Sequence, residues 1–124
     1  MRPRVYYFEI PVTDLERAIT FYSVVFGCEF DRVDVDGNQM ANFPSLEGES
    51  GAFGALAKGD SYIPSVQGVR VYFDTDSIDK TLANAVAAGG KVLYPKTSVG
   101  KFGWVAEFED SEGNCIALSQ LLSG

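Results

Sequence analysis

The chain has 124 residues, of which 46% are hydrophobic and 22% are charged, and these proportions fit one globular domain (residues 1–124) and exclude a disordered chain. Its formal net charge of −7 and its scattered Lys and Arg residues argue against nucleic acid or an anionic membrane as a partner. No stretch approaches the roughly 20 apolar residues of a membrane span, and the opening residues lack the apolar core of a signal peptide, so we expect a cytoplasmic protein.

The first half begins with a strand and a helix. A β-rich run over residues 5–10 stops at Pro11, which lacks the N–H that a strand ladder needs. Apolar residues then recur at helical spacing in "DLERAITFYSVVFG", where Thr13 or Asp14 can cap the helix and Gly27 stands where a left-handed residue closes it. The pattern predicts a β-strand followed by an amphipathic helix.

Three shorter signals complete this half. The "DGN" at residues 36–38 lies between alternating runs and predicts a hairpin, and "GAFGALAKG" predicts one more strand. Residues 58–67 are polar and rich in Gly, Ser and Pro, which is typical of a linker.

The second half repeats the plan of the first. "VRVYFDT" predicts a strand, and the segment after it predicts a helix that starts at Asp76 and is closed by glycines. "KVLYPKTSV" predicts a strand broken at Pro95, and the remaining residues predict two strands around a "DSEGN" turn.

A shift of 63 residues relates the two halves. It carries residues 15–19 (LERAI) onto residues 78–82 (IDKTL), which match in charge and apolar character, and it carries Gly27 onto Gly90. Both halves also finish with Ala-Leu, one residue out of that register. The coincidence predicts two copies of one βαβββ unit.

One such unit alone would expose an apolar sheet face and two open edges, so it must pair with another. We therefore expect an α+β fold in which module one (residues 4–57) and module two (residues 68–121) form a cup-shaped, partly open mixed sheet. The helices should cover the convex side. The concave side is then the natural place for a ligand.

Two segments carry a family resemblance. "FEIPVTDLERAITFYSVVFG" near the start and "FEDSEGNCIALSQ" near the end, together with the repeat, resemble the vicinal oxygen chelate superfamily of glyoxalase I, extradiol dioxygenases and fosfomycin- and bleomycin-resistance proteins. The chain looks most like the short bacterial proteins related to lactoylglutathione lyase. The resemblance covers residues 4 to 120 and implies the same fold.

The resemblance also implies where a metal would be held. Enzymes of the superfamily bind one divalent ion through a His or Glu on the first strand of each module and a carboxylate on the last strand of each. These positions correspond here to Tyr7, Arg70, Ala55 and Ala117, and the chain has no histidine. Alanine offers no electron pair and a guanidinium repels a cation, so we expect neither a metal site nor another cofactor.

The nearest carboxylates are Glu9 and Glu107, which at most suit a weakly held hard ion. If chemistry survives, one of them, desolvated and helped by Tyr7, would have to transfer the proton. Cys28 and Cys115 are too few and too far apart for a disulfide framework, and we expect buried free thiols.

The candidate ligand-binding residues lie on the expected inner faces of the strands. They are the polar residues Tyr7, Glu9, Arg70, Tyr72 and Glu107, the apolar walls Phe53 and Trp104, and the small residues Ala55 and Ala117. An arginine within "VRVYF" must turn outward, pair with Glu9 or Glu107, or meet an anionic ligand.

Three functions remain open from the sequence. The first is a metal-free protein that binds a small organic molecule, similar to the bleomycin-resistance branch of the family. The second is a lyase- or dioxygenase-related enzyme of unknown substrate, and the third is an interaction module. We expect a homodimer, because family relatives usually pair and the opening segment is rich in Tyr and Phe. Whether the modules pair within one chain or exchange between chains stays open.

Overall fold

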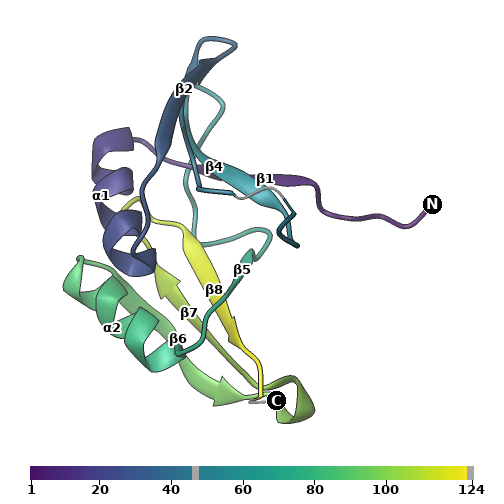
Figure 1. The fold of residues 1–124 in the computed structure, drawn as a ribbon. Helices are drawn as coiled ribbons and strands as arrows, with labels where there is room; N and C mark the ends of the chain where they lie inside the picture. Colours follow the sequence, from purple (N-terminus) through teal and green to yellow (C-terminus); the bar gives the residue numbers. More distant parts are fainter. Residues whose placement is uncertain (46–47, 123–124) are drawn as a thin grey trace.

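The computed structural model describes residues 1–45 and 48–122, and its first module contains one helix and four strands (Figure 1). In chain order these elements are β1 (Tyr7–Pro11), α1 (Leu15–Phe26), β2 (Asp31–Val35), β3 (Asn38–Asn42) and β4 (Phe53–Lys58). The second module follows with β5 (Tyr72–Asp74), α2 (Ile78–Ala87), β6 (Lys91–Ser98), a short 3₁₀ helix (Gly100–Phe102), β7 (Trp104–Glu109) and β8 (Cys115–Gln120). The two βαβββ modules predicted from the repeat are confirmed.

The internal repeat is visible in the strand register. In module one the parallel strands β1 and β4 place Glu9 opposite Ala55, and in module two β5 and β8 place Tyr72 opposite Ala117. Glu9 and Tyr72 are 63 residues apart, whereas the two alanines are offset by one, as in the sequence comparison. The same backbone positions therefore occur twice, with different side chains on them.

Each module forms its own sheet. The strand orders are β1-β4-β3-β2 and β5-β8-β7-β6, so both sheets are mixed. Within the described residues no ladder of hydrogen bonds joins the two sheets, and the single curled sheet of the prediction is divided at the boundary between the modules. The α+β fold with an open mixed arrangement is otherwise confirmed.

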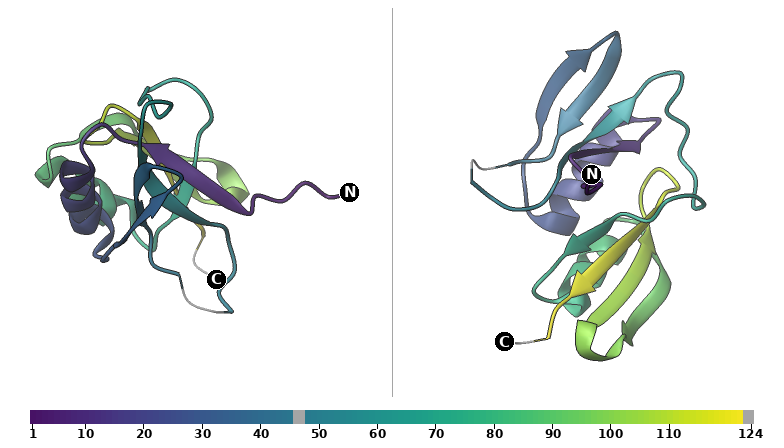
Figure 2. Two further views of the ribbon diagram at one scale, coloured as in Figure 1. Left: turned by 90° about the horizontal axis from the view of Figure 1, so that it is seen from above. Right: turned by 90° about the vertical axis from the view of Figure 1, so that its right-hand side faces the viewer.

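Both helices lie on the same side of the strands, as Figures 1 and 2 show. The core lies between the helices and the two sheets and contains residues of both modules. Its fully buried large side chains are Tyr22, Phe21, Phe108, Leu56, Ile78, Leu118 and Val12. The opposite side of each sheet is left without a covering helix, and we call it the free face.

The helix caps were predicted correctly for α1 and incorrectly for α2. The Asp14 side chain accepts a hydrogen bond from the Arg17 N–H, and Gly27 closes α1 with a φ of 63°. In α2 the capping side chain belongs to Ser77, not to Asp76, because Ser77 directly precedes the first helical residue and accepts from the Lys80 N–H.

The prediction that glycines close α2 is confirmed: Gly89 has a positive φ of 103°, and Gly90 leaves room for the Glu109 carbonyl oxygen and the ring of Phe21. One expectation about module two was wrong. Strand β6 continues through Pro95 instead of breaking there. It is the outer strand of its sheet and has register shifts on either side of Tyr94, and both features accommodate a residue without an N–H.

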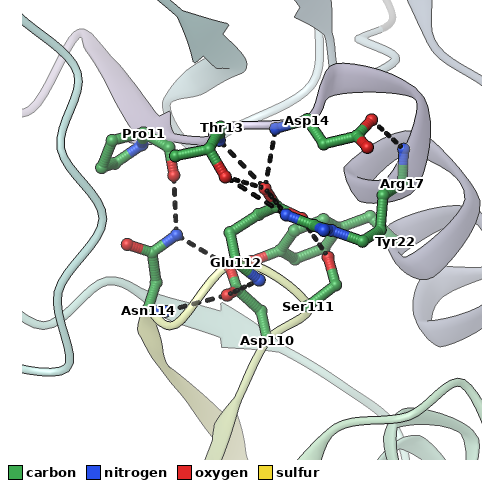
Figure 3. Close-up of polar contacts among 9 residues, drawn as sticks. All are labelled: Pro11, Thr13, Asp14, Arg17, Tyr22, Asp110, Ser111, Glu112 and Asn114. Carbon is green, nitrogen blue, oxygen red and sulfur yellow. Dashed lines mark hydrogen bonds and ion pairs between the residues drawn. The ribbon is translucent and has the colours of Figure 1, made fainter.

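The turn between β7 and β8 forms hydrogen bonds that connect module two to module one (Figure 3). The Glu112 carboxylate accepts hydrogen bonds from the backbone N–H groups of Thr13 and Asp14 and from the Arg17 side chain. Below it, the buried hydroxyl of Tyr22 donates to Asp110. In this structure the two modules of one chain pack on each other through these contacts.

No helix in residues 1–45 and 48–122 is long and apolar enough to cross a membrane.

Candidate functional site

Strand alternation separates the core side from the free face. On β1, Phe8 and Ile10 belong to the core, and the ring of Phe8 lies over Gly54, where a Cβ atom would come within 2.4 Å of it. The alternate residues of the strand, Tyr7 and Glu9, face the other way. The predicted placement of Tyr7, Glu9, Phe53 and Ala55 on one face therefore agrees with the packing.

A tyrosine from the linker covers this half of the free face. Tyr62 donates its hydroxyl to Glu9 Oε1 at 2.8 Å, and Tyr7 donates to Glu9 Oε2 at 3.0 Å. The two tyrosines pack on a small cluster that includes Met40 and Ala55. Sequence reasoning missed Tyr62, although an aromatic residue inside a polar linker is the signal that could have found it.

Tyr7 keeps its proton near neutral pH in this setting. Partial burial and the hydrogen bond to the Glu9 carboxylate raise the pKa of Tyr7 to about 12. Glu9 itself is exposed, so it is not the desolvated general base that the sequence suggested. Its carboxylate acts here as an acceptor for two phenols.

The corresponding half in module two is more open. One row across the sheet consists of Tyr72, Ala117, Glu107 and Tyr94, which are paired in that order. The two tyrosines are 52% and 44% exposed, while Ala117 is fully buried between its neighbours. The row thus has an aromatic side chain at each end, and the small residue Ala117 lies between Tyr72 and Glu107.

Arg70 lies beside this row and pairs with Glu107. Its Nε atom donates to Glu107 Oε2 at 3.1 Å, and Nη1 is 3.4 Å from the Gly68 carbonyl. The side chain is still 41% exposed. Of the alternatives left open, the ion pair with Glu107 is present, whereas Glu9 is held by tyrosines. Within the described residues, Nη2 of Arg70 has no acceptor at hydrogen-bond distance.

Cys115 adjoins the same ion pair. Its thiol lies 3.5 Å from Glu107 Oε1 and donates to it, and burial, followed by this carboxylate, raises the pKa of Cys115. The thiol therefore stays protonated and unreactive near neutral pH. Both cysteines are free, and Cys115 is buried as expected, but Cys28 is only half-buried.

Trp104 does not belong to this face, which corrects its assignment as an apolar wall. It shares its side of β7 with Ala106 and Phe108 and packs against the core. Lys96 lies over its ring, 5.1 Å from the ring centre. The error arose because the residue was assigned from its position near two glycines, whereas the strand period decides the face.

The residues present do not fit the divalent ion that the fold implies. Tyr7 donates its proton to Glu9, Arg70 is a cation, and both alanines lack donor atoms. In residues 1–45 and 48–122 no group of three or more His, Cys, Asp or Glu side chains is placed to hold a metal. The carboxylates of Glu9 and Glu107 are engaged separately, one in each module.

Comparison with known proteins identifies the family. The sequence pattern of the Glyoxalase/Bleomycin resistance protein/Dioxygenase superfamily matches residues 4–118. The chain belongs to this superfamily. A glyoxylase-like domain-containing protein from Didymella fabae is 32% identical over 114 residues, which are 89% of this chain and 88% of that protein. The resemblance stated from the sequence is confirmed.

Solved structures of the superfamily share the fold. A glyoxalase/bleomycin resistance protein from Albidiferax ferrireducens superposes with a TM-score of 0.70 at 18% identity, over 94% of this chain and 98% of that one. Glyoxalase I from Zea mays superposes with a TM-score of 0.68 at 21% identity, over 92% of this chain. The chain spans only 44% of the maize protein. At these identities the likeness extends to the fold alone.

Proposed function

We propose that this superfamily member binds a small organic anion on the free face of module two and does so without the metal of its relatives. The proposal rests on one observation above all, the half-exposed Arg70 beside the row of Tyr72, Ala117 and Glu107. Its Nε donates to Glu107 and its Nη1 to the Gly68 carbonyl, which leaves Nη2 to donate to a carboxylate or phosphate.

The surroundings of Arg70 suit an organic anion better than a simple ion. Tyr72 and Tyr94 stand at opposite ends of the row, three strand spacings apart, which is about 14 Å. A flat ring can lie against the exposed face of Tyr72 while its anionic group meets Arg70. Aromatic walls with a few polar anchors are typical of small-molecule sites. The bleomycin-resistance proteins within the superfamily are consistent with a binding role.

The enzymatic alternative has less support from these side chains. Proton transfer by Glu9 would require a desolvated carboxylate, and Glu9 is exposed and bound to two phenols. Tyr7 holds its proton more tightly than a free tyrosine does. Binding needs none of these groups to change its protonation state.

The test is to treat the protein with a metal chelator, titrate it with benzoate, and follow the backbone amide shifts by NMR. We expect shifts at Tyr72, Glu107 and Ala117, and an affinity at least about tenfold lower in Arg70→Ala, the cost of a lost charge-assisted hydrogen bond. Benzyl alcohol, a neutral analogue, should bind more weakly. Arg32→Ala is the matched control, because Arg32 is also an exposed, ion-paired arginine but lies on module one. Equal affinity of the two variants would refute the role of Arg70.

We also propose that two copies of the chain associate through the segment before β1. Residues 1–6 are exposed throughout and project away from the body in Figure 1. Val5 and Tyr6 are 73% and 75% exposed, and the ring centre of Tyr6 lies 4.9 Å from that of the partly exposed Phe53. Light scattering should give the mass of a dimer for the native chain and of a monomer for Tyr6→Glu. A monomeric native chain would contradict this proposal.

A further inference from the structure

A pocket of about 200 Å³ lies where the linker crosses from module one to module two. We propose that it is a second binding site, separate from Arg70, for a neutral single-ring molecule that carries a hydroxyl group, of which phenol is the simplest case. The site takes its acceptor, Glu9, from module one and its thiol, Cys115, from module two.

The walls of the pocket come from three parts of the chain. Glu9 of β1, Cys115 of β8 and, among others, Ile63 and Val71 of the segment that joins the modules line it, next to the core residues Ile10 and Ile116. The lining is mixed, because Ser65, Gln67 and Asn114 add polar groups to these side chains. Backbone and side-chain contacts hold the linker over it, since Tyr62 donates to Glu9 and the Ser65 N–H donates to Asn114 Oδ1.

The size of the pocket limits its occupant. A pocket of about 200 Å³ that is open on one side has room for one six-membered ring with a small substituent, since an enclosed apolar cavity of about 150 Å³ already holds one benzene molecule. The mouth is bordered by Ile63 and Val69, which are 77% and 93% exposed. Exposed apolar side chains around an opening favour an uncharged, largely apolar ligand.

The Glu9 carboxylate is the hydrogen-bond acceptor for the hydroxyl group of this ligand. The carboxylate already accepts hydrogen bonds from the phenol groups of Tyr7 and Tyr62, one on each oxygen. A carboxylate has about four lone-pair sites, so a third hydroxyl can donate to it. The same charge repels an anion, and benzoate should not enter. The Cys115 thiol already donates to Glu107 and contributes apolar surface here.

The experiment is an NMR titration of the full chain with phenol, followed at the backbone amides of Ile10, Val71 and Ile116. We expect saturable shifts at these amides. Benzene should bind more weakly than phenol. Glu9→Gln should reduce the affinity for phenol several-fold, because a hydrogen bond to a charged acceptor is replaced by a neutral one.

Matched variants locate the site. Val69→Trp places a bulky ring at the mouth and should weaken phenol binding at least tenfold, whereas Val66→Trp, on the same exposed linker but outside the lining, should not. Neither position is buried, so both variants should fold. The proposal is overturned if phenol leaves the three amides unchanged up to its solubility limit, or if Val69→Trp binds it as the native chain does.

The proposals for the two sites can be tested separately, because each variant should weaken binding at one site only. Arg70→Ala should leave phenol binding intact, and Val69→Trp should leave benzoate binding intact, because the pocket lining does not include Arg70. Loss of both ligands in either variant would contradict two separate sites.

Discussion

Arg17 of α1 forms two hydrogen bonds with Glu112 in the turn between β7 and β8. Its Nε donates to Oε2 at 2.7 Å, and its Nη2 donates to Oε1 at 3.0 Å. The contact spans 95 residues of sequence and joins the two modules. The Glu112 side chain is completely inaccessible to solvent, while that of Arg17 is half-exposed. This pair fixes the relative position of the two sheets and hence of both candidate sites.

The stability of the protein should depend on the ionisation of Glu112. Burial by itself would raise the pKa of Glu112, but the hydrogen bonds from Arg17, Asp14, Thr13 and Ser111 outweigh it and lower the pKa to about 2, from an ordinary value of 4.5. A depressed folded-state pKa stabilises the fold above pH 4.5. This contribution, about 3 kcal/mol, is lost as the pH falls from 4.5 toward 2.

Replacing this carboxylate tests the assignment. Glu112→Gln should lower the free energy of unfolding at pH 7 by about 3 kcal/mol and flatten its dependence on pH between 4.5 and 2. Glu109→Gln is the control, because Glu109 faces Lys91 across 4.0 Å at the surface and such pairs contribute at most about 1 kcal/mol. Urea unfolding at several pH values measures both. An unchanged acid slope in Glu112→Gln would show that other groups control acid unfolding.

Tyr7 should ionise later than an ordinary tyrosine. Its pKa of about 12 reflects burial first and the hydrogen bond to Glu9 second. A raised folded-state pKa stabilises the fold below pH 10, and this contribution disappears as the pH rises toward 12. In Glu9→Gln the pKa of Tyr7 should fall without reaching 10, because burial remains. The tyrosinate absorbance, assigned by difference from Tyr7→Phe, reports it, and no change in Glu9→Gln would disprove the coupling.

Gly90 should tolerate no side chain. A Cβ atom there would lie 2.6 Å from the Glu109 carbonyl oxygen and 3.0 Å from the ring of Phe21. Gly90→Ala must displace backbone, and we expect a loss of about 2 kcal/mol in the free energy of unfolding. Val86→Ala, at a half-exposed position of α2, is the comparison and should cost well under that. Equal stability of the two variants would mean that the backbone around Gly90 moves to accept a side chain at no cost in free energy.

Much of the fold was predictable because the signals were local and occurred twice. Asp14, Gly27 and the "DGN" turn specify one cap, one helix end and one hairpin, and Asp36 and Gly37 do adopt the positive φ values that such a turn requires. The repeat then supplied the second module. Pro95 misled because its meaning depends on whether the strand is at the edge of its sheet, which is a property of the assembled fold.

The strand faces of the site residues were predictable from the sequence, but their hydrogen-bond partners were not. Strand period placed Tyr7, Glu9 and Arg70 on the free face, but it could not show that Glu9 accepts two phenols, because Tyr62 reaches it from 53 residues away. For the same reason the Arg17 and Glu112 contact was not foreseen. Trp104 was misassigned because neighbouring glycines were weighted above the alternation of the strand.

At the four positions where its relatives hold a metal, this member of the superfamily has side chains that cannot hold a transition ion. Elemental analysis of the purified, dialysed protein tests it most directly. With tyrosine, arginine and two alanines at the four positions, we predict far less than one equivalent of zinc, nickel, iron or manganese per chain. One equivalent of any of these metals, retained through dialysis and released by Glu9→Gln or Glu107→Gln, would contradict the account.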